Sequence, residues 1–299
     1  MFAFTCRRQE IYAILYIRAY NMKIQFLGTA AAEGVPAVFC NCGVCRDIRR
    51  LGATEFRTRS QVIIDGVLSV DFPPDAYAHS LKFGTELSKL RYLFVTHSHM
   101  DHFYAHDFIL RGYKYAELAE KRLEIFGNKE VKAVFSECTA REMKNQVAPN
   151  LNFNLIEPYR EYRAGDYRVL TVPARHSLTE DCLLFYVEKE KKGYLHMCDT
   201  ALPDDSVYDF LAEKGAKPRL VALDCTFGAN RTEANARHMS IYDDMQVKNK
   251  MLAAGIIDAD TKIVITHFSH NCNPTRNNLN YLERHFGVAA AYDGFQTEI

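Results

Sequence analysis

The chain has 299 residues, of which 48% are hydrophobic and 25% charged, and this ordinary globular composition excludes a disordered or fibrous protein. Its 37 basic and 37 acidic residues give zero formal net charge, which argues against a protein that mainly grips a nucleic-acid backbone. Nine cysteines, an odd number in a long chain, favour a reduced cytoplasmic protein over a secreted disulfide framework.

The first 21 residues look like an extension of the chain. Their apolar stretch, Ile11–Ile17, is too short to span a bilayer, and no small-residue cleavage site follows it. We therefore predict an N-terminal extension at residues 1–21, a mis-called start being one explanation, and a single domain at residues 22–299. We expect no membrane association, since no other segment is a transmembrane candidate.

Short apolar runs and helical periodicity alternate along the rest of the chain. The Asp65-Gly66 dipeptide predicts a tight type I′ hairpin between two of the strands. The predicted strands are Ile24–Leu27, Gln61–Ile64, Val67–Val70, Leu93–Val95, Val169–Val172, Leu183–Val187, Tyr194–Met197, Leu220–Leu223 and Ile263–Thr266. The predicted helices are Phe103 to about Glu120, Ser136–Asn145, Asp204–Glu213 and Asp243–Ala254. This order predicts a mixed α/β body with two sheets.

Histidines and carboxylates gather at the ends of these strands. The strand before Thr96 runs directly into His97, His99, Asp101 and His102. Imidazole and carboxylate suit zinc, manganese and iron, so two adjacent metal ions are the natural interpretation. A polar loop of capping histidines is the alternative, and four ligand-type residues within six positions argue against it.

Three later strands end in the same way. His176, Asp199 and His267 each follow an apolar run closely. Any one alone would be interpreted as an ordinary surface residue, but active sites gather at strand ends in sheet proteins, so their recurrence favours one shared metal site.

A cysteine cluster suggests a second kind of site. Cys40, Cys42 and Cys45 have the spacing C-x-C-x-x-C, and a tetrahedral structural zinc needs one more ligand. His270, three residues after His267, is a candidate for it. The alternative is three buried or casually exposed thiols, which would be open to oxidation unless coordinated.

The whole set resembles the metallo-β-lactamase superfamily, whose signature is H-x-H-x-D-H with a later His, Asp and His. The resemblance runs from Met22 to the C-terminus and implies a four-layer αββα sandwich with a dinuclear site at one edge. It implies that the first ion is held by His97, His99 and His176, and the second by Asp101, His102 and His267, with Asp199 bridging both. It also implies that Asp71 orients the histidine loop.

A narrower resemblance is to the phosphoribosyl cyclic phosphate phosphodiesterase group of the carbon–phosphorus lyase pathway. It rests on Phe26–Thr29, Glu33–Pro36, the cysteine cluster and the terminal T-H-x-x-H. The resemblance implies an additional active-site histidine at His238, for which a surface residue at a helix start is the alternative.

One segment departs from the family pattern. Where many members read D-H-x-x-G-L, this chain continues with Phe103-Tyr104-Ala105-His106-Asp107, so His106 is extra and is either a substrate contact or an exposed helical residue. The departure leaves the substrate open. His79, His196 and His285 have no motif support and are expected to be structural.

These expectations combine into a metal-dependent phosphodiesterase. Two divalent ions about 3.5–4 Å apart can bridge a hydroxide and lower its pKa, so we predict two zinc or manganese ions and hydrolysis of a small cyclic phosphodiester by that hydroxide. His238 and Asp101 are the candidate catalytic residues, and one structural zinc completes the cofactors. The expected partner is the small-molecule substrate, without membrane or nucleic acid, and a homodimer is left open.

Two alternatives come from the same superfamily. A tRNA 3′-end-processing endoribonuclease shares the histidine cluster but relies on basic, glycine-rich elements that this chain lacks. A non-hydrolytic metabolite-binding relative of the pyrroloquinoline quinone biosynthesis protein shares the cysteine motif.

Overall fold

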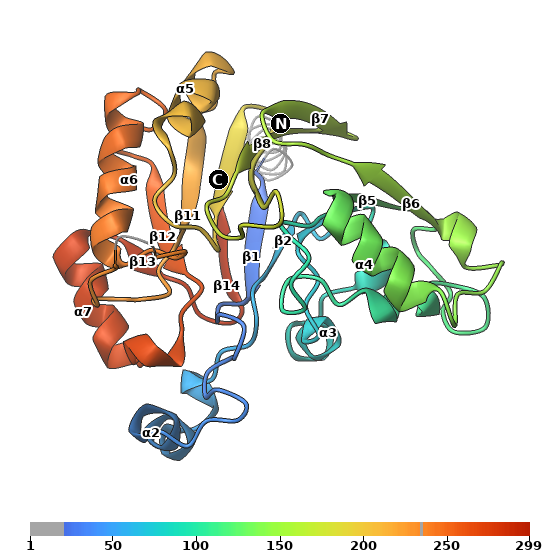
Figure 1. Ribbon diagram of the computed structural model, residues 1–299, viewed down its shortest axis with the longest axis horizontal. Coiled ribbons are helices and arrows are strands. Elements are labelled where there is room, and N and C mark those ends of the chain that lie inside the picture. The colour runs from blue at the N-terminus through green and yellow to red at the C-terminus, as the bar shows by residue number, and fades with distance from the viewer. Residues whose placement is uncertain (1–20, 234–235) are drawn as a thin grey trace, which may run out of the picture.

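The computed structural model describes residues 21–233 and 236–299, and within them two seven-stranded sheets pack face to face (Figure 1). Residues 1–20 of the predicted extension lie outside the described residues, so the predicted boundary after residue 21 stays a prediction. Met22 is buried and exchanges two backbone hydrogen bonds with Ile299. Among the helices of the described residues, none combines the length and the apolar character needed to cross a membrane.

The first sheet contains the N-terminal strands and one C-terminal strand, in the order β14-β1-β2-β3-β4-β5-β6. Strands β3 to β6 are parallel to one another, whereas β1 is antiparallel to both β2 and β14. Its strands are β1 (Lys23–Gly28), β2 (Gln61–Ile64), β3 (Leu68–Val70), β4 (Tyr92–Phe94), β5 (Leu123–Gly127), β6 (Leu151–Leu155) and β14 (Phe295–Glu298).

The second sheet follows the order β13-β12-β11-β10-β9-β8-β7. Strands β10 to β13 are parallel, and β7 to β10 are antiparallel. Its strands are β7 (Arg160–Ala164), β8 (Tyr167–Pro173), β9 (Leu183–Lys189), β10 (Lys192–Met197), β11 (Pro218–Asp224), β12 (Lys262–Thr266) and β13 (Ala289–Ala290).

Helices cover the outer face of each sheet, which gives the predicted four-layer αββα sandwich and confirms the fold class. Helices α3 (Ala76–Phe83) and α4 (Lys129–Thr139) pack on the first sheet. The second sheet is covered by α5 (Asp205–Glu213), α6 (Ile241–Ala253) and α7 (Arg276–Phe286). Helix α2 (Gly43–Leu51) lies apart at the bottom of the view in Figure 1.

Within residues 21–233 and 236–299, five short 3-10 helices join these elements. They are η1 (Ala53–Glu55), η2 (Leu87–Lys89), η3 (Ala105–Leu110), η4 (Ala148–Asn150) and η5 (His270–Cys272).

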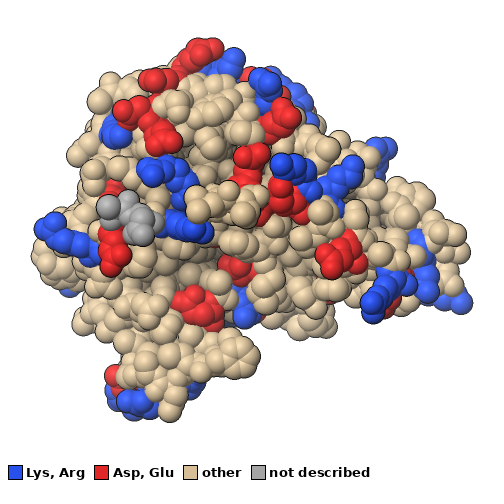
Figure 2. All heavy atoms as spheres, in the orientation of Figure 1, with Lys and Arg blue, Asp and Glu red and all other residues tan. Residues whose placement is uncertain are grey.

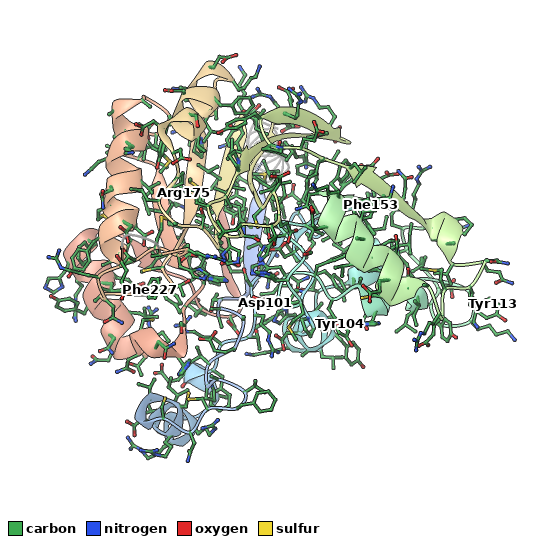
Figure 3. All side chains as sticks on the ribbon, in the orientation of Figure 1. Asp101, Tyr104, Tyr113, Phe153, Arg175 and Phe227 are labelled. Atoms are coloured by element: carbon green, nitrogen blue, oxygen red, sulfur yellow. The ribbon has the colours of Figure 1, made fainter. Side chains whose placement is uncertain are left out.

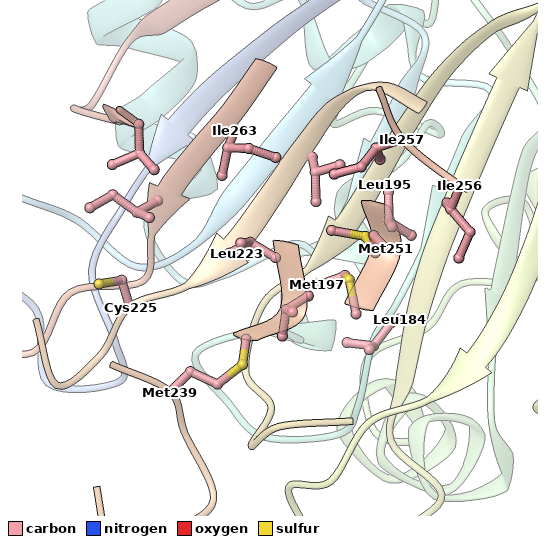
Figure 4. Close-up of a cluster of buried hydrophobic side chains, with 14 of the residues drawn as sticks. Leu184, Leu195, Met197, Leu223, Cys225, Met239, Met251, Ile256, Ile257 and Ile263 are labelled. Carbon is pink, nitrogen blue, oxygen red and sulfur yellow. The ribbon is translucent and has the colours of Figure 1, made fainter. Parts of the chain in front are cut away.

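The inner strands read as continuous apolar runs because both of their faces are buried. On β10, Tyr194 belongs to the core between the two sheets, whereas Leu195 and Met197 point to the helical layer. Figure 4 shows Leu195 and Met197 among the side chains that fill this helical side, together with Leu223 and Met251. Two packed faces fix the strand register, so the loops that leave the strands start from fixed positions.

The predicted strands are confirmed within two residues at their ends, and so is the hairpin. Asp65 and Gly66 have φ of 52° and 73°, which is the left-handed pair that a type I′ turn requires. The predicted helices Asp204–Glu213 and Asp243–Ala254 are confirmed as α5 and α6.

Two predicted helices are wrong or displaced. In place of Phe103 to Glu120 the chain has only η3, because Phe103 bridges to Phe72 and the chain then turns at Gly112, whose φ is 113°. The helix predicted at Ser136–Asn145 is α4, which begins earlier, where the side chain of Asn128 accepts from the N–H of Val131.

Candidate metal centre

Strands from both sheets end at one edge and carry polar residues there. Strands β3 and β4 run parallel, as do β10, β11 and β12, so their carboxyl ends point the same way within each sheet. Figure 3 shows Asp101 near the middle of the view, where loops from the two halves meet, with Phe227 and Tyr104 on either side. The polar residues are Asp71 after β3, His97, His99, Asp101 and His102 after β4, His176 after β8, Asp199 after β10, Asp224 at the end of β11 and His267 after β12.

The loop after β4 is held by the buried carboxylate of Asp71. Its Oδ1 accepts from the backbone N–H of Thr96 at 2.8 Å and from the Thr96 hydroxyl at 2.9 Å. Its Oδ2 accepts from Nδ1 of His102 at 2.7 Å. Because Nδ1 of His102 faces Asp71, Nε2 is the ring nitrogen that faces the other ligand-type side chains. The structure thus places Asp71 in the orienting position that the resemblance implied.

Three imidazoles form the first group of ligand-type side chains. Nδ1 of His99 lies 2.9 Å from Nε2 of His97 and 3.2 Å from Nε2 of His176. Asp199 joins them, with Oδ2 at 3.1 Å from Nε2 of His97. Burial lowers the pKa of His99 and brings that of His176 to about 4, so both rings are neutral at pH 7 and can offer lone pairs.

A second group shares Asp199 with the first. Oδ2 of Asp199 lies 3.1 Å from Nε2 of His102 and 3.9 Å from Nε2 of His267, and Oδ2 of Asp101 lies 3.2 Å from Nε2 of His102. The Thr226 hydroxyl donates to the carbonyl oxygen of His267 at 2.9 Å, so it accepts from Nδ1 of His267 at 2.8 Å, and Nε2 of His267 faces the second group. Burial opposes ionisation of Asp199, but neighbouring histidines outweigh it and hold its pKa well below the ordinary value.

These groups fit divalent cations. Within each group the candidate ligand atoms lie within 4.8 Å of one another. Nε2 of His267 is buried and has no hydrogen-bond partner within residues 21–233 and 236–299. An unpartnered buried polar atom is costly, and a cation at this point would satisfy it. The structure therefore brings all seven predicted ligands together, and their coordination of metal stays a prediction.

Backbone strain marks the same edge. Asp71, Asp199 and His267 have φ of 64°, 61° and 62°. Residues other than glycine rarely adopt this left-handed conformation, and such residues gather at functional sites.

The three cysteines and His270 also meet. Nδ1 of His270 lies 3.6 Å from Sγ of Cys42 and 3.4 Å from Sγ of Cys45, and all four ligand atoms, including Sγ of Cys40, lie within 4.8 Å of one another. The backbone N–H of Cys45 and the ring of His270 lower the pKa of the Cys42 thiol to about 6, whereas burial raises that of Cys45 to about 11. Three sulfurs and one imidazole nitrogen are a typical ligand set for a structural zinc.

His238 is partly buried and lies against the second group. Its Nδ1 is 3.0 Å from Oδ1 of Asp199 and 3.1 Å from Oδ2 of Asp224. Burial lowers its pKa, but the two carboxylates outweigh burial and raise the pKa to about 10. The structure therefore places His238 at the edge of the site, with Nδ1 held by carboxylates.

Sequence reasoning missed Asp224 and Thr226. Asp224 is buried and accepts from the backbone N–H of Thr226 at 2.9 Å as well as from His238. The sequence does contain a signal for Asp224, because this residue directly follows the predicted strand Leu220–Leu223, as the other ligand-type residues follow theirs.

The remaining predicted residues have other surroundings. His79 is buried and hydrogen-bonded to Gln61 and Thr58. Nδ1 of His196 lies 2.8 Å from the hydroxyl oxygen of Tyr194 and shares a hydrogen bond with it. His285 stacks on Tyr281, and His106 is exposed on η3 beside Tyr104. None of the four belongs to a metal-ligand group of the described residues.

Comparison with known proteins places the chain in a family. The beta-lactamase superfamily domain matches residues 60–268, and the chain belongs to this superfamily. Together with the histidine and aspartate clusters, the family supports a metal-dependent hydrolase. A search of curated proteins found no significant match to the sequence.

Several solved structures share the fold at low sequence identity. A diphosphatase from the PhnP family is 18% identical with a TM-score of 0.70, over 93% of this chain and 97% of that one. Zn²⁺-bound PqqB from Methylobacterium extorquens is 16% identical with a TM-score of 0.69, over 93% of this chain and all of that one (100%). The short form of human tRNase Z is 14% identical with a TM-score of 0.63, over 92% and 98% of the two chains.

Proposed function

We propose that this protein is a metal-dependent phosphodiesterase that hydrolyses a small, cyclic phosphodiester. The observation that carries the proposal is the convergence of seven ligand-type side chains with His238, which lies against Asp199 at the edge of the site. We further propose zinc or manganese at the two shared sites, zinc at the cysteine cluster, and a small-molecule substrate in the cytoplasm.

The roles of the residues follow from their positions. The first ion would be held by His97, His99 and His176, the second by Asp101, His102 and His267, and both by Asp199. Two divalent ions held there would activate a water molecule and offset the charge of the phosphodiester. Asp71 and Thr226 fix the protons of His102 and His267 on Nδ1, which keeps Nε2 of both rings available.

His238 is suited to handle the leaving group. The carboxylate of Asp224 accepts from Nδ1 and is itself fixed by the backbone N–H groups of Thr226, Met239 and Thr200. With Nδ1 held in this way, Nε2 is the ring atom free to approach substrate. We propose that it gives a proton to the departing alkoxide oxygen, for which general-acid help is typically worth ~10²–10⁴ in rate.

A small hollow beside His238 supports a small substrate. Its volume is about 250 Å³, just under the usual range for pockets that hold drug-sized ligands. Arg175, whose position is labelled in Figure 3, lines it together with Thr232 and Leu202. We propose that this hollow receives the part of the substrate that leaves.

The charge distribution supports a small molecule over RNA. On the face drawn in Figure 2, basic and acidic side chains are interspersed, without a continuous basic tract. The fold is shared with tRNase Z, but a precursor-tRNA nuclease would need such a tract to neutralise phosphates. Binding of a precursor tRNA that weakens steeply with added salt would favour the nuclease instead.

The test is hydrolysis by the metal-loaded protein. The protein loaded with Zn²⁺ or Mn²⁺ is incubated with bis-p-nitrophenyl phosphate and with a panel of cyclic and linear phosphodiesters. We expect hydrolysis with at least one ion, with preference for a small cyclic diester. Asp199→Ala should abolish it, whereas Asp209→Ala, at an exposed position on α5, should not. No hydrolysis with either ion would favour a metabolite-binding protein.

A further inference from the structure

The loop between His176 and β9 contains a carboxylate, Glu180, that hydrogen-bonds to the loop after β4. Oε1 of Glu180 accepts from the backbone N–H of Ser98 at 2.8 Å, and Oε2 accepts from the Ser98 hydroxyl at 2.7 Å. Oε1 also accepts from Nδ2 of Asn128 at 2.8 Å. These three hydrogen bonds link segments 52 to 82 residues apart in the sequence.

The position of Ser98 gives these bonds their significance. Ser98 lies between His97 and His99, and Glu180 lies in the loop that follows His176. One carboxylate therefore joins the loops that carry the first group of ligand-type residues. His97 is fully buried and packed, but His99 is exposed, so the position of His99 depends more on the bonds of its own loop.

Asn128 anchors the carboxylate from a third direction. Its Oδ1 caps helix α4 by accepting from Val131 N–H, and its Nδ2 donates to Glu180 and to the carbonyl of Asp181 at 3.0 Å. Because α4 packs on the first sheet, Glu180 is tied to the rigid body of the domain and not only to two loops.

We propose that Glu180 is a positioning residue that sets the geometry of the site formed by His97, His99 and His176. The inference rests on the proposed dinuclear centre and adds to it a selective support for one of its two ions. The second group is oriented by other residues, since Asp71 holds His102 and Thr226 holds His267. Loss of Glu180 should therefore lower the affinity for the first ion more than the affinity for the second.

The test measures metal affinity of the two sites in the full chain. Metal-depleted protein is titrated with Zn²⁺ against a chromophoric chelator, and bound zinc is counted by elemental analysis. We expect Glu180→Ala to lower the affinity for one ion by about 10–100-fold, the usual range for groups that orient metal ligands. Glu180→Gln should restore most of this loss, because its amide oxygen can accept from both N–H groups and its amide N–H can donate to the Ser98 hydroxyl.

A matched control separates this role from general stability. Glu124 on β5 likewise accepts from two amide side chains, Asn152 and Asn154, and pairs with Arg122. Asn128 follows the carboxyl end of β5, whereas Glu124 lies near the amino end of that strand. Glu124→Ala therefore removes a comparable set of hydrogen bonds far from the histidine groups and should leave both zinc affinities unchanged.

Paired substitutions identify the ion that is lost. In a protein that carries His99→Ala, which already removes the first ion, Glu180→Ala should change zinc affinity little further. In a protein that carries His267→Ala, Glu180→Ala should lower the affinity for the first ion by its full factor. First-site affinity within about threefold of the unaltered protein would overturn the inference, as would a parallel loss of both ions or a Gln variant as weak as the Ala variant. Failure of the unaltered protein to bind ions at the histidine groups would instead refute the proposed function.

Discussion

Replacing Asp71 by asparagine should disable the predicted metal ligand His102 without altering His102 itself. Asp71 lies in the left-handed region at φ 64°, which asparagine tolerates, and the two side chains have the same shape. The amide oxygen that Asp71→Asn introduces can keep the bond from Thr96 N–H, but the new NH₂ group then faces Nδ1 of His102. Nδ1 must accept from that NH₂, so the ring proton moves to Nε2, and the lone pair that would bind the ion is lost.

The size of the effect follows from the bond that is lost. A hydrogen bond to a buried carboxylate contributes about 1.5–3 kcal/mol, which corresponds to roughly 10–150-fold in affinity. We therefore expect Asp71→Asn to lower the zinc affinity of the second group by about that factor. The assay is competition with a chromophoric chelator, with hydrolysis of bis-p-nitrophenyl phosphate measured in parallel.

Asp65→Asn is the matched control. Asp65 also has positive φ, 52°, and accepts from Tyr167, but it belongs to the hairpin and to none of the metal-ligand groups of the described residues. It should leave zinc affinity unchanged. If the Asp71→Asn variant bound both ions as tightly as the Asp65→Asn variant, Asp71 would not be the group that fixes the tautomer of His102.

Three further predictions follow from the same contacts. Thr226→Val should lower the zinc affinity of the second group by at least about tenfold, because it removes the hydroxyl that holds Nδ1 of His267. Thr226→Ser keeps the hydroxyl and should keep the affinity, and equal affinities of the two variants in a zinc titration would contradict this role. His238→Ala should slow a diester with a poor alkoxide leaving group ~10²–10⁴-fold and an activated p-nitrophenyl ester far less, and equal losses in steady-state kinetics would remove the general-acid role. Burial lowers the pKa of His79 from 6.5 to about 4, so the unfolded chain binds the proton more tightly and stability falls as pH drops from about 6.5 towards 4. Between about pH 7 and pH 5 this costs about 2 kcal/mol, and urea unfolding should show that His79→Gln removes that part of the pH dependence; an unchanged slope would contradict the assignment.

Much of the site was predictable because its residues follow strands at short, fixed distances. A buried strand fixes where the next residues begin, so His97, His176 and His267 could be placed at one edge from sequence order alone. The same rule, applied to Leu220–Leu223, would have found Asp224.

The partners of these residues could not be predicted in that way. Glu180 and Asn128 meet Ser98 only because the two sheets bring distant loops together, and no local pattern marks them. The orientation of an exposed ligand-type residue such as His99 depends on tertiary contacts.

Errors in the helices have local causes. The apolar spacing after Phe103 resembled a helix, but Gly112 and Tyr113 adopt positive φ and end it. Helix α2 was not predicted because it is short and only two of its residues, Cys45 and Ile48, are buried, which is too brief a pattern to indicate a helix.

A crystal structure of the zinc-loaded protein, with anomalous scattering recorded at the zinc edge, is the most direct test of the proposed metal centre. We expect two peaks about 3.5–4 Å apart, each about 2.0–2.2 Å from its imidazole and carboxylate ligands, with Asp199 in contact with both. A third peak should lie among the three sulfurs and His270. A map without density between Asp199 and the surrounding histidines would show that these residues do not form a metal centre.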